Sequence, residues 1–222
     1  MAISQDVLDA LWDFSDPAAS EARLREAVKT ETDAATRCEL ETQVARALGL
    51  QDRFTDADAV LDAIDSSDAV VRTRVALERG RVRNSSGDAA AAITLFVEAT
   101  DAAAAGSSAD EGDPSRSFAH LDFLLVDALH MLAIADSENS AHWTEMALQR
   151  LDGVTDARTL RWRVGLHNNR GWALFDAGDV PGAIAEFEKA KDAASRWGTP
   201  QQVEWADEAL AEARASLDAY GR

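Results

Sequence analysis

The chain has 222 residues and a formal net charge of −18 at pH 7, and hydrophobic residues, many of them alanine, make up 46% of it. The alanine content and the scarcity of β-branched runs favour helices over sheets. The negative charge opposes binding to nucleic-acid phosphates and to anionic membrane surfaces, so we expect neither partner.

The cysteine content and the hydrophobic runs indicate the compartment. Cys38 is the only cysteine, which excludes a disulfide within the chain. The first residues, Met1 to Asp6, have neither a basic start nor an apolar run and do not read as a signal peptide. No segment approaches the ~20 apolar residues that span a bilayer. We therefore expect a soluble, cytoplasmic protein.

The first 36 residues predict an irregular helical hairpin. Its first helix, Ser4–Phe14, ends where Asp16 can cap the next helix and Pro17 can begin it. In that second helix, small, bulky and small residues follow at Ser20, Leu24 and Ala27. Clearer hairpins downstream repeat this order of side chains.

Three later segments can be laid over one another: Gln43–Ile64, Glu78–Ala99 and Asn169–Ala190. Each has a small residue, a turn seven to eight positions later, a second small residue, and a bulky apolar residue four positions after that. The first small residues are Ala45, Gly80 and Gly171, the second are Ala57, Ala92 and Ala183, and the bulky residues are Leu61, Phe96 and Phe187.

The spacing predicts pairs of antiparallel helices that cross closely at the small residues, while the bulky residues fill the gap beside the crossing. In the turns, Gly87-Asp88 and Gly178-Asp179 join a glycine that can end one helix in the left-handed conformation to an aspartate that can cap the next helix. Asp52-Arg53 stands at this place in the first segment and is a weaker turn signal.

These features resemble the tetratricopeptide repeat (TPR), a helix–turn–helix unit of about 34 residues. The resemblance implies an all-α, right-handed α-solenoid of about five TPR-like helix hairpins plus a C-terminal capping helix, in a single domain over residues 1–222. The expected parts are a degenerate hairpin at 1–36, repeats at 38–66 and 73–105, a linker at 106–114, a degenerate repeat at 115–152, a repeat at 155–197 and a capping helix at 199–220.

The last helix has one apolar side and one acidic side. We expect its apolar side to cover the final repeat, with Val203, Ala206, Leu210, Ala213 and Leu217. We expect its acidic side to face water, with Glu204, Asp207, Glu208 and Glu212.

The TPR resemblance also implies a concave groove lined by the first helix of each hairpin. Aligned on their small residues, the clear repeats begin at Cys38, Thr73 and Val164. The groove positions that the resemblance implies are then Glu39, Arg74 and Gly165 (second), Thr42, Leu77 and Asn168 (fifth), and Arg46, Arg81 and Trp172 (ninth).

The arginines at these positions predict an acidic partner. Arg74 and Arg81 are seven residues apart and share a helix face, and Arg46 lies one repeat away in the same row. Guanidinium groups bind carboxylates through paired donors, so such a row would favour an acidic peptide or a free C-terminus. Replacing Arg81 by alanine should then weaken binding with little loss of stability. Alternatively, these arginines neutralise neighbouring aspartates and glutamates.

A second stripe runs along the helix before Gly178. Arg161, Gly165, Asn168 and Trp172 follow the spacing i, i+4, i+7 and i+11. Asparagine can bind a peptide backbone, and tryptophan offers a flat apolar surface. Some TPR domains hold a terminal carboxylate with Lys, Asn and Arg, but no lysine stands at the aligned positions here. Alternatively, Trp172 belongs to the core.

Asp127 and His130 lie three residues apart in an otherwise apolar helix. Burying either group without a partner is unfavourable, so they either pair in the interior or face the groove.

The sequence carries no phosphate-binding glycine loop, nucleophile elbow or Cys/His metal spacing. We therefore expect a non-catalytic TPR adaptor or scaffold, without cofactor or metal, that binds a protein or an extended peptide. The alternative is a sensor domain that encloses a small ligand or a signal peptide. The sequence indicates no oligomeric state.

Overall fold

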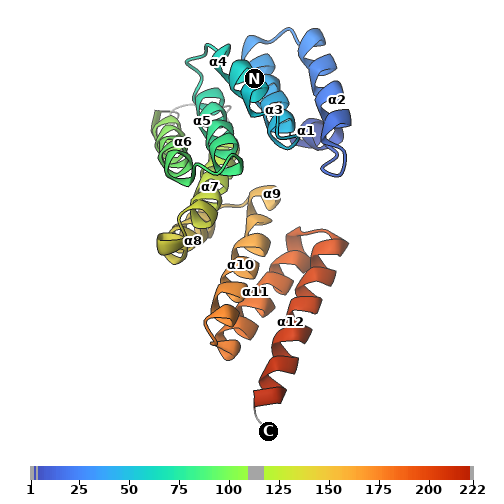
Figure 1. Cartoon of the computed structure of the whole chain (residues 1–222), viewed down its shortest axis with the longest axis vertical. Helices are drawn as coiled ribbons and strands as arrows, with labels where there is room; N and C mark the ends of the chain where they lie inside the picture. The colour runs from blue at the N-terminus through green and yellow to red at the C-terminus, as the bar shows by residue number, and fades with distance from the viewer. Residues whose placement is uncertain (1–2, 4, 110–117, 221–222) are drawn as a thin grey trace. The chain divides into compact units, whose positions relative to one another are not determined.

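The computed structural model describes residues 3, 5–109 and 118–220 (Figure 1). Within these ranges the chain is helical and contains no strand, which confirms the expected all-α class. The helices fall into two compact units, which we call unit 1 (residues 1–140) and unit 2 (residues 141–222).

Unit 1 contains seven helices in the described residues: α1 (Gln5–Leu11), α2 (Pro17–Thr30), α3 (Ala34–Gly49), α4 (Phe54–Asp62), α5 (Ala69–Ser85), α6 (Ala89–Ala109) and α7 (Phe118–Ala135). A 3-10 turn, Ser137–Asn139, follows α7. Consecutive helices from α2 to α7 pack against one another, and α3 and α7 also contact α5.

Unit 2 begins with α8 (Ser140–Arg150), whose first residue closes unit 1, and a second 3-10 turn, Leu151–Gly153. Its other helices are α9 (Ala157–Leu160), α10 (Trp162–Asp176), α11 (Val180–Trp197) and α12 (Pro200–Tyr220). Helix α11 packs against both α10 and α12, and Figure 1 shows these three helices side by side.

The turns of the three similar segments have one shared geometry. Gly87 and Gly178 have φ angles of 89° and 83°, and Asp52 stands at the same place with a φ of 57°. The next residue in each turn donates its backbone N–H to the carbonyl five residues earlier, at 3.0 Å for Arg53, 2.9 Å for Asp88 and 2.9 Å for Asp179. This bond ends each first helix. The predicted turn is therefore confirmed in all three segments.

The helices that follow these turns are capped to different degrees. Oδ1 of Asp88 accepts from the backbone N–H of Ala91 at 3.1 Å, and Oδ1 of Asp179 accepts from that of Gly182 at 3.0 Å. Arg53, at the N-cap of α4, makes no side-chain capping bond. The first segment is thus the weakest turn, as its sequence predicts.

We expect the substitution Asp52→Gly to raise the free energy of unfolding by about 1 kcal/mol, because the left-handed conformation costs a non-glycine residue roughly that much. The Asp52 side chain is exposed, so little packing is lost. Urea unfolding followed by circular dichroism would measure the gain. The reciprocal control is Gly87→Ala, which should lower the free energy of unfolding. A lower free energy of unfolding with Asp52→Gly would contradict the left-handed conformation of residue 52.

The close crossings of the hairpins are also confirmed. A Cβ atom added to Gly80 would lie 2.4 Å from Cε1 of Phe96, and one added to Gly171 would lie 2.4 Å from Cε1 of Phe187. Both phenylalanines are fully buried. In each pair an aromatic ring of the second helix therefore fills the space that the glycine of the first helix leaves open.

The predicted linker is partly helical. Helix α6 continues through Gly106 to Ala109, and the remaining linker residues, 110–114, lie outside the described residues. Gly106 is buried in the contact with the neighbouring helices, since an added Cβ would lie 2.7 Å from Cβ of Ala69 and 2.9 Å from Cδ1 of Leu121. The composition of residues 106–114 indicated a loop. At Gly106, however, the absence of a side chain allows neighbouring helices to pack closely.

Helix α6 also departs from a second expectation. By length and composition alone, one stretch among the described residues, Ala89–Ser107, could cross a membrane, whereas the sequence analysis expected none. In unit 1, α6 packs against α5 and α7 and buries Ala92, Phe96 and Ala99.

The last helix covers α11 over part of the expected face. Ala206, Leu210 and Ala213 are buried, whereas Leu217, one turn further on, is 43% exposed. The expected apolar face is therefore correct up to Ala213 and wrong for Leu217.

Candidate functional site

Two of the three predicted binding arginines of unit 1, Arg74 and Arg81, contact buried acidic groups. Nε of Arg74 lies 3.1 Å from Oε2 of Glu39, and the two residues are 5% and 1% exposed. The other carboxylate oxygen of Glu39 accepts a hydrogen bond from the backbone N–H of Ile3 at 3.2 Å. Burial raises the pKa of Glu39, an effect that the charge of Arg74 partly offsets. Arg74 therefore joins α5 to α3 inside the unit.

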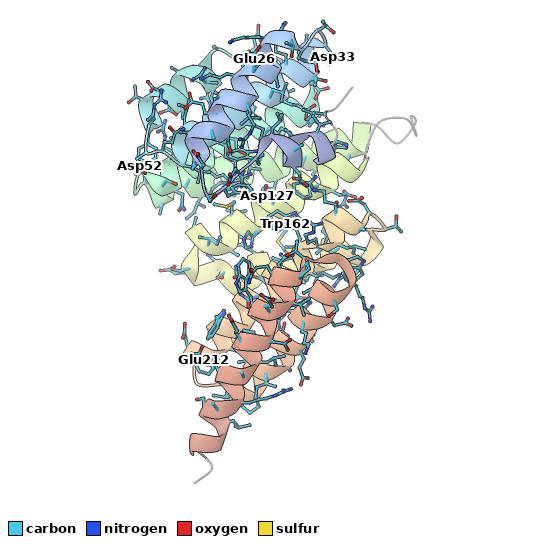
Figure 2. The ribbon with its side chains drawn as sticks, turned by 90° about the vertical axis from the view of Figure 1, so that its right-hand side faces the viewer. Glu26, Asp33, Asp52, Asp127, Trp162 and Glu212 are labelled. Atoms are coloured by element: carbon cyan, nitrogen blue, oxygen red, sulfur yellow. The ribbon has the colours of Figure 1, made fainter. Side chains whose placement is uncertain are left out.

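Arg81 bridges two carboxylates. Its terminal nitrogens lie 2.5 Å from Oε1 of Glu78, on the same helix, and 2.5 Å from Oδ1 of Asp127 on α7. The side chain of Arg81 is 14% exposed, and those of Glu78 and Asp127 are 1% and 4% exposed. Figure 2 shows Asp127 within the crowded side chains of unit 1. This ion-pair triad ties α5 to α7.

The pKa values in this cluster show how strongly its charges interact. Burial alone would raise the pKa of Asp127, but the charges of Arg81 and Arg46 outweigh burial and lower it. Burial likewise acts to lower the pKa of Arg81, and the charges of Asp127 and Glu78 outweigh it and raise the pKa. Burial is the main cause of the lowered pKa of His130. Asp127 is therefore paired with Arg81, and the charges of both Asp127 and Arg81 act on the buried His130.

Arg46 completes the predicted row in a different environment. Its guanidinium carbon lies 5.7 Å from the ring centre of Trp12 and 5.5 Å from that of Phe14, and these two rings are stacked 4.9 Å apart. Trp12 also donates its indole N–H to Oε1 of Gln43 at 3.2 Å. The segment that follows α1 therefore lies against the predicted groove position of α3.

Arg46, Arg74 and Arg81 are thus close enough for their charges to interact, and the contacts of their guanidinium groups are with other side chains of unit 1. The alternative that the sequence analysis left open, neutralisation of neighbouring carboxylates, describes Arg74 and Arg81. Their donors already bind buried carboxylates, so an acidic peptide would have to displace an internal partner.

Unit 2 contains a groove that is open to solvent and has a volume of about 450 Å³; we call it the unit 2 groove. Helix α10 forms one wall, α12 forms the other, and α11 contributes Ala190 at the floor. Three of the four residues in the predicted stripe line it: Gly165, Asn168 and Trp172. Most of the predicted stripe therefore lies on one wall of the groove.

The fourth residue of the stripe, Arg161, is not part of this lining. It lies between α9 and α10 and donates from Nε to the backbone carbonyl of Trp197 at 3.0 Å. A cation at the end of α11 stabilises the carbonyl groups there. The structure therefore places Arg161 as a contact with the end of α11.

The wall on α10 combines a core contact with an open surface. The ring of Trp172 packs edge-on against Phe187, with centres 5.0 Å apart, while another part of it lines the groove. Trp172 therefore both contacts the buried Phe187 and lines the groove. The side-chain amide of Asn168 makes no hydrogen bond within the described residues. Nothing within 4 Å would meet a Cβ added to Gly165, so the groove has room beside this position.

The wall on α12 contributes the residues that the sequence analysis did not select as binding residues. Trp205, Glu208 and Glu212 line the groove, and Trp205 is 58% exposed (Figure 2, which labels Glu212). Their spacing of three and four residues places them along one face of α12. The sequence did indicate that Glu208 and Glu212 face solvent. The signal that could have found the wall was an exposed tryptophan beside this acidic stripe.

The charged residues that line the groove are acidic. Among the described residues that line it, Glu208 and Glu212 are the only charged ones, and neither takes part in an ion pair. Cations elsewhere on α11 and α12 are paired with other acids, as in Lys189–Glu186, Lys191–Asp207 and Arg214–Glu188. The groove therefore has an apolar, aromatic lining with a negative edge.

Within the described residues, no group of three or more His, Cys, Asp or Glu side chains is arranged to hold a metal ion. In comparisons with known proteins, no model of a known family matches the chain, and no curated protein matches it either.

Proposed function

We propose that this protein is a non-catalytic module that binds a peptide or protein segment in the unit 2 groove. One observation carries the proposal: Trp205 is 58% exposed in a groove that also holds Trp172 and the unpaired amide of Asn168. Large exposed aromatic side chains in a concave site are typical of binding anchors, and a free amide can bind a peptide backbone.

The repeat resemblance supports the same proposal at the level of architecture. The shared turn at Asp52, Gly87 and Gly178 and the matched glycine–phenylalanine crossings are features expected of TPR-like hairpins. We propose that these hairpins belong to a right-handed solenoid that serves as an adaptor or scaffold in the cytoplasm. A groove that is open to solvent, and not an enclosed cavity, can accept a segment of a longer chain.

Two substitutions test the groove directly, with peptides selected from a random phage-displayed library on the wild-type protein as probes. Trp205→Ala removes the exposed aromatic anchor, and Gly165→Leu fills the open space beside Asn168. Each should weaken the selected peptides at least about tenfold, which corresponds to about 1.4 kcal/mol and lies within the range for aromatic anchors. Fluorescence anisotropy would measure the affinities.

The matched control is Ile134→Ala, which removes an apolar side chain that is 50% exposed in unit 1. It should leave peptide affinity unchanged, and circular dichroism should show that all three variants remain folded. The proposal fails if no peptide is enriched, or if the selected peptides bind all variants equally. If native mass spectrometry instead finds a small molecule retained by the wild type and lost in Gly165→Leu, the alternative of a small-ligand sensor is favoured.

A further inference from the structure

We infer that the occupant of the unit 2 groove is a cationic peptide segment, with one apolar and two basic residues at successive alternate positions of an extended chain. This inference rests on the proposed function and specifies the chemistry of its partner. It replaces the acidic partner expected from the sequence, because Arg74 and Arg81 bind carboxylates within unit 1.

The negative charge of the groove favours a cationic occupant. Glu208 and Glu212 lie one helical turn apart, line the groove and take part in no ion pair among the described residues. Like charges at this spacing repel one another on a helix, so a bound cation relieves an unfavourable contact as well as forming new ones. No cation among the described lining residues competes for these carboxylates.

The spacing of the carboxylates selects the form of the peptide. Four residues of helix α12 rise about 6 Å between Glu208 and Glu212. In an extended peptide, side chains two residues apart point the same way and are separated by about 7 Å. Basic residues at alternate positions can therefore each reach one glutamate, while the residue between them points toward solvent.

The aromatic lining accounts for the apolar part of the peptide. Trp205 precedes Glu208 by one turn on the same face of α12, and Trp172 lies on the opposite wall. An apolar side chain two positions from the basic pair points the same way as the basic side chains and can pack between these rings, and an arginine can also stack on an exposed indole. Asn168, on the wall with Trp172, can hold the peptide backbone.

The net charge of −18 acts in the same direction over a longer range. It draws cationic segments toward the protein and repels acidic ones, and salt screens both effects. The affinity for cationic peptides should therefore fall as the salt concentration rises, mainly because association becomes slower.

Four labelled dodecapeptides test the inference by fluorescence anisotropy. The first carries a leucine and two arginines at successive alternate positions. In the second the arginines are replaced by glutamates, in the third by glutamines, and in the fourth the leucine is replaced by glycine. We expect the first peptide to bind best, the third and fourth at least about tenfold more weakly, and the second not measurably.

The double variant Glu208→Gln/Glu212→Gln should lose at least about tenfold in affinity for the arginine peptide at low salt, and its affinity should depend less on salt. The matched control, Glu98→Gln/Asp101→Asn, removes the same charge from exposed, unpaired positions on α6 of unit 1. It should change the affinity less than about twofold, because neither residue lines the groove and no direct contact with the peptide is lost.

The outcomes separate this inference from the proposed function. If the glutamine peptide binds as tightly as the arginine peptide and Trp205→Ala weakens both, the groove binds peptides but the cationic class is wrong. If no peptide responds to Trp205→Ala, the proposed function fails as well. If sedimentation shows a dimer that Trp205→Ala converts to a monomer, the occupant is a second copy of this chain and the inference is overturned.

Discussion

Replacing Arg81 by methionine should lower the free energy of unfolding by about 3 kcal/mol, because removing one member of a buried ion pair leaves an uncompensated buried charge. Here two carboxylates lose their partner, Glu78 and Asp127, whose side chains are 1% and 4% exposed. Because methionine keeps most of the side-chain volume, the loss of unfolding free energy measures mainly the removal of the guanidinium charge. Urea unfolding monitored by circular dichroism would measure it.

The pH dependence of this loss distinguishes a charge effect from a packing effect. In the wild type the pKa of Asp127 is lowered, so its contribution to stability is present above the ordinary pKa of 3.8 and is lost as the pH falls through the lower pKa of the folded state. Without Arg81, burial should raise the pKa of Asp127, and its carboxylate should then destabilise the fold at neutral pH. The deficit of Arg81→Met should therefore shrink as the pH falls from about 7 toward 5.

Two comparisons control this prediction. Arg72→Met removes an exposed arginine from the same helix, and should change stability by no more than about 0.5 kcal/mol. Adding Asp127→Asn to Arg81→Met should recover part of the loss, because it removes one of the two stranded charges. A loss below about 1 kcal/mol for Arg81→Met would contradict the structural role and restore the row of arginines as a candidate binding surface.

Two glycines of α10 should respond to alanine with opposite signs. Gly165→Ala should raise the free energy of unfolding by roughly 0.8 kcal/mol, because alanine favours helix over glycine by about this amount and meets no atom within 4 Å. Gly171→Ala should lower it by about 1–3 kcal/mol despite the same gain in helix propensity, because the new Cβ would lie 2.4 Å from Cε1 of Phe187.

The two variants control one another, since they make the same chemical change in the same helix. Chemical unfolding of both under one set of conditions would measure the difference. Adding Phe187→Leu to Gly171→Ala should give less than the sum of the two separate losses, because the smaller side chain removes the clash. If Gly171→Ala is as stable as Gly165→Ala, the crossing of α10 and α11 is looser than the structure indicates.

The hairpins themselves were predictable because the signals for them are local. The turns at Gly87 and Gly178 require a left-handed residue and a cap, and both residues are adjacent in the sequence. The crossing at Gly171 and Phe187 follows from a fixed spacing along two consecutive helices. Asn168 and Trp172 were also placed correctly on one wall, because residues four apart share a helix face.

The partners of the arginines were not predictable from their positions. A helical spacing assigns Arg74 and Arg81 to one face, but it does not say whether solvent or another helix covers that face. The packing of α3 and α7 against α5 decides this, because it brings Glu39 and Asp127 from distant parts of the chain to the guanidinium groups. Because these ion pairs are buried, removing one partner would leave an uncompensated charge inside the protein.

By itself, then, the sequence determined the all-helical class, the turns, the close crossings and one wall of the groove, because each of these depends on residues within one or two helices. Only the tertiary structure decided which charges are internal and which remain available. The packing of α12 against α11 brings Trp205, Glu208 and Glu212 opposite Asn168 and Trp172. That contact joins positions more than thirty residues apart, and no local spacing specifies it.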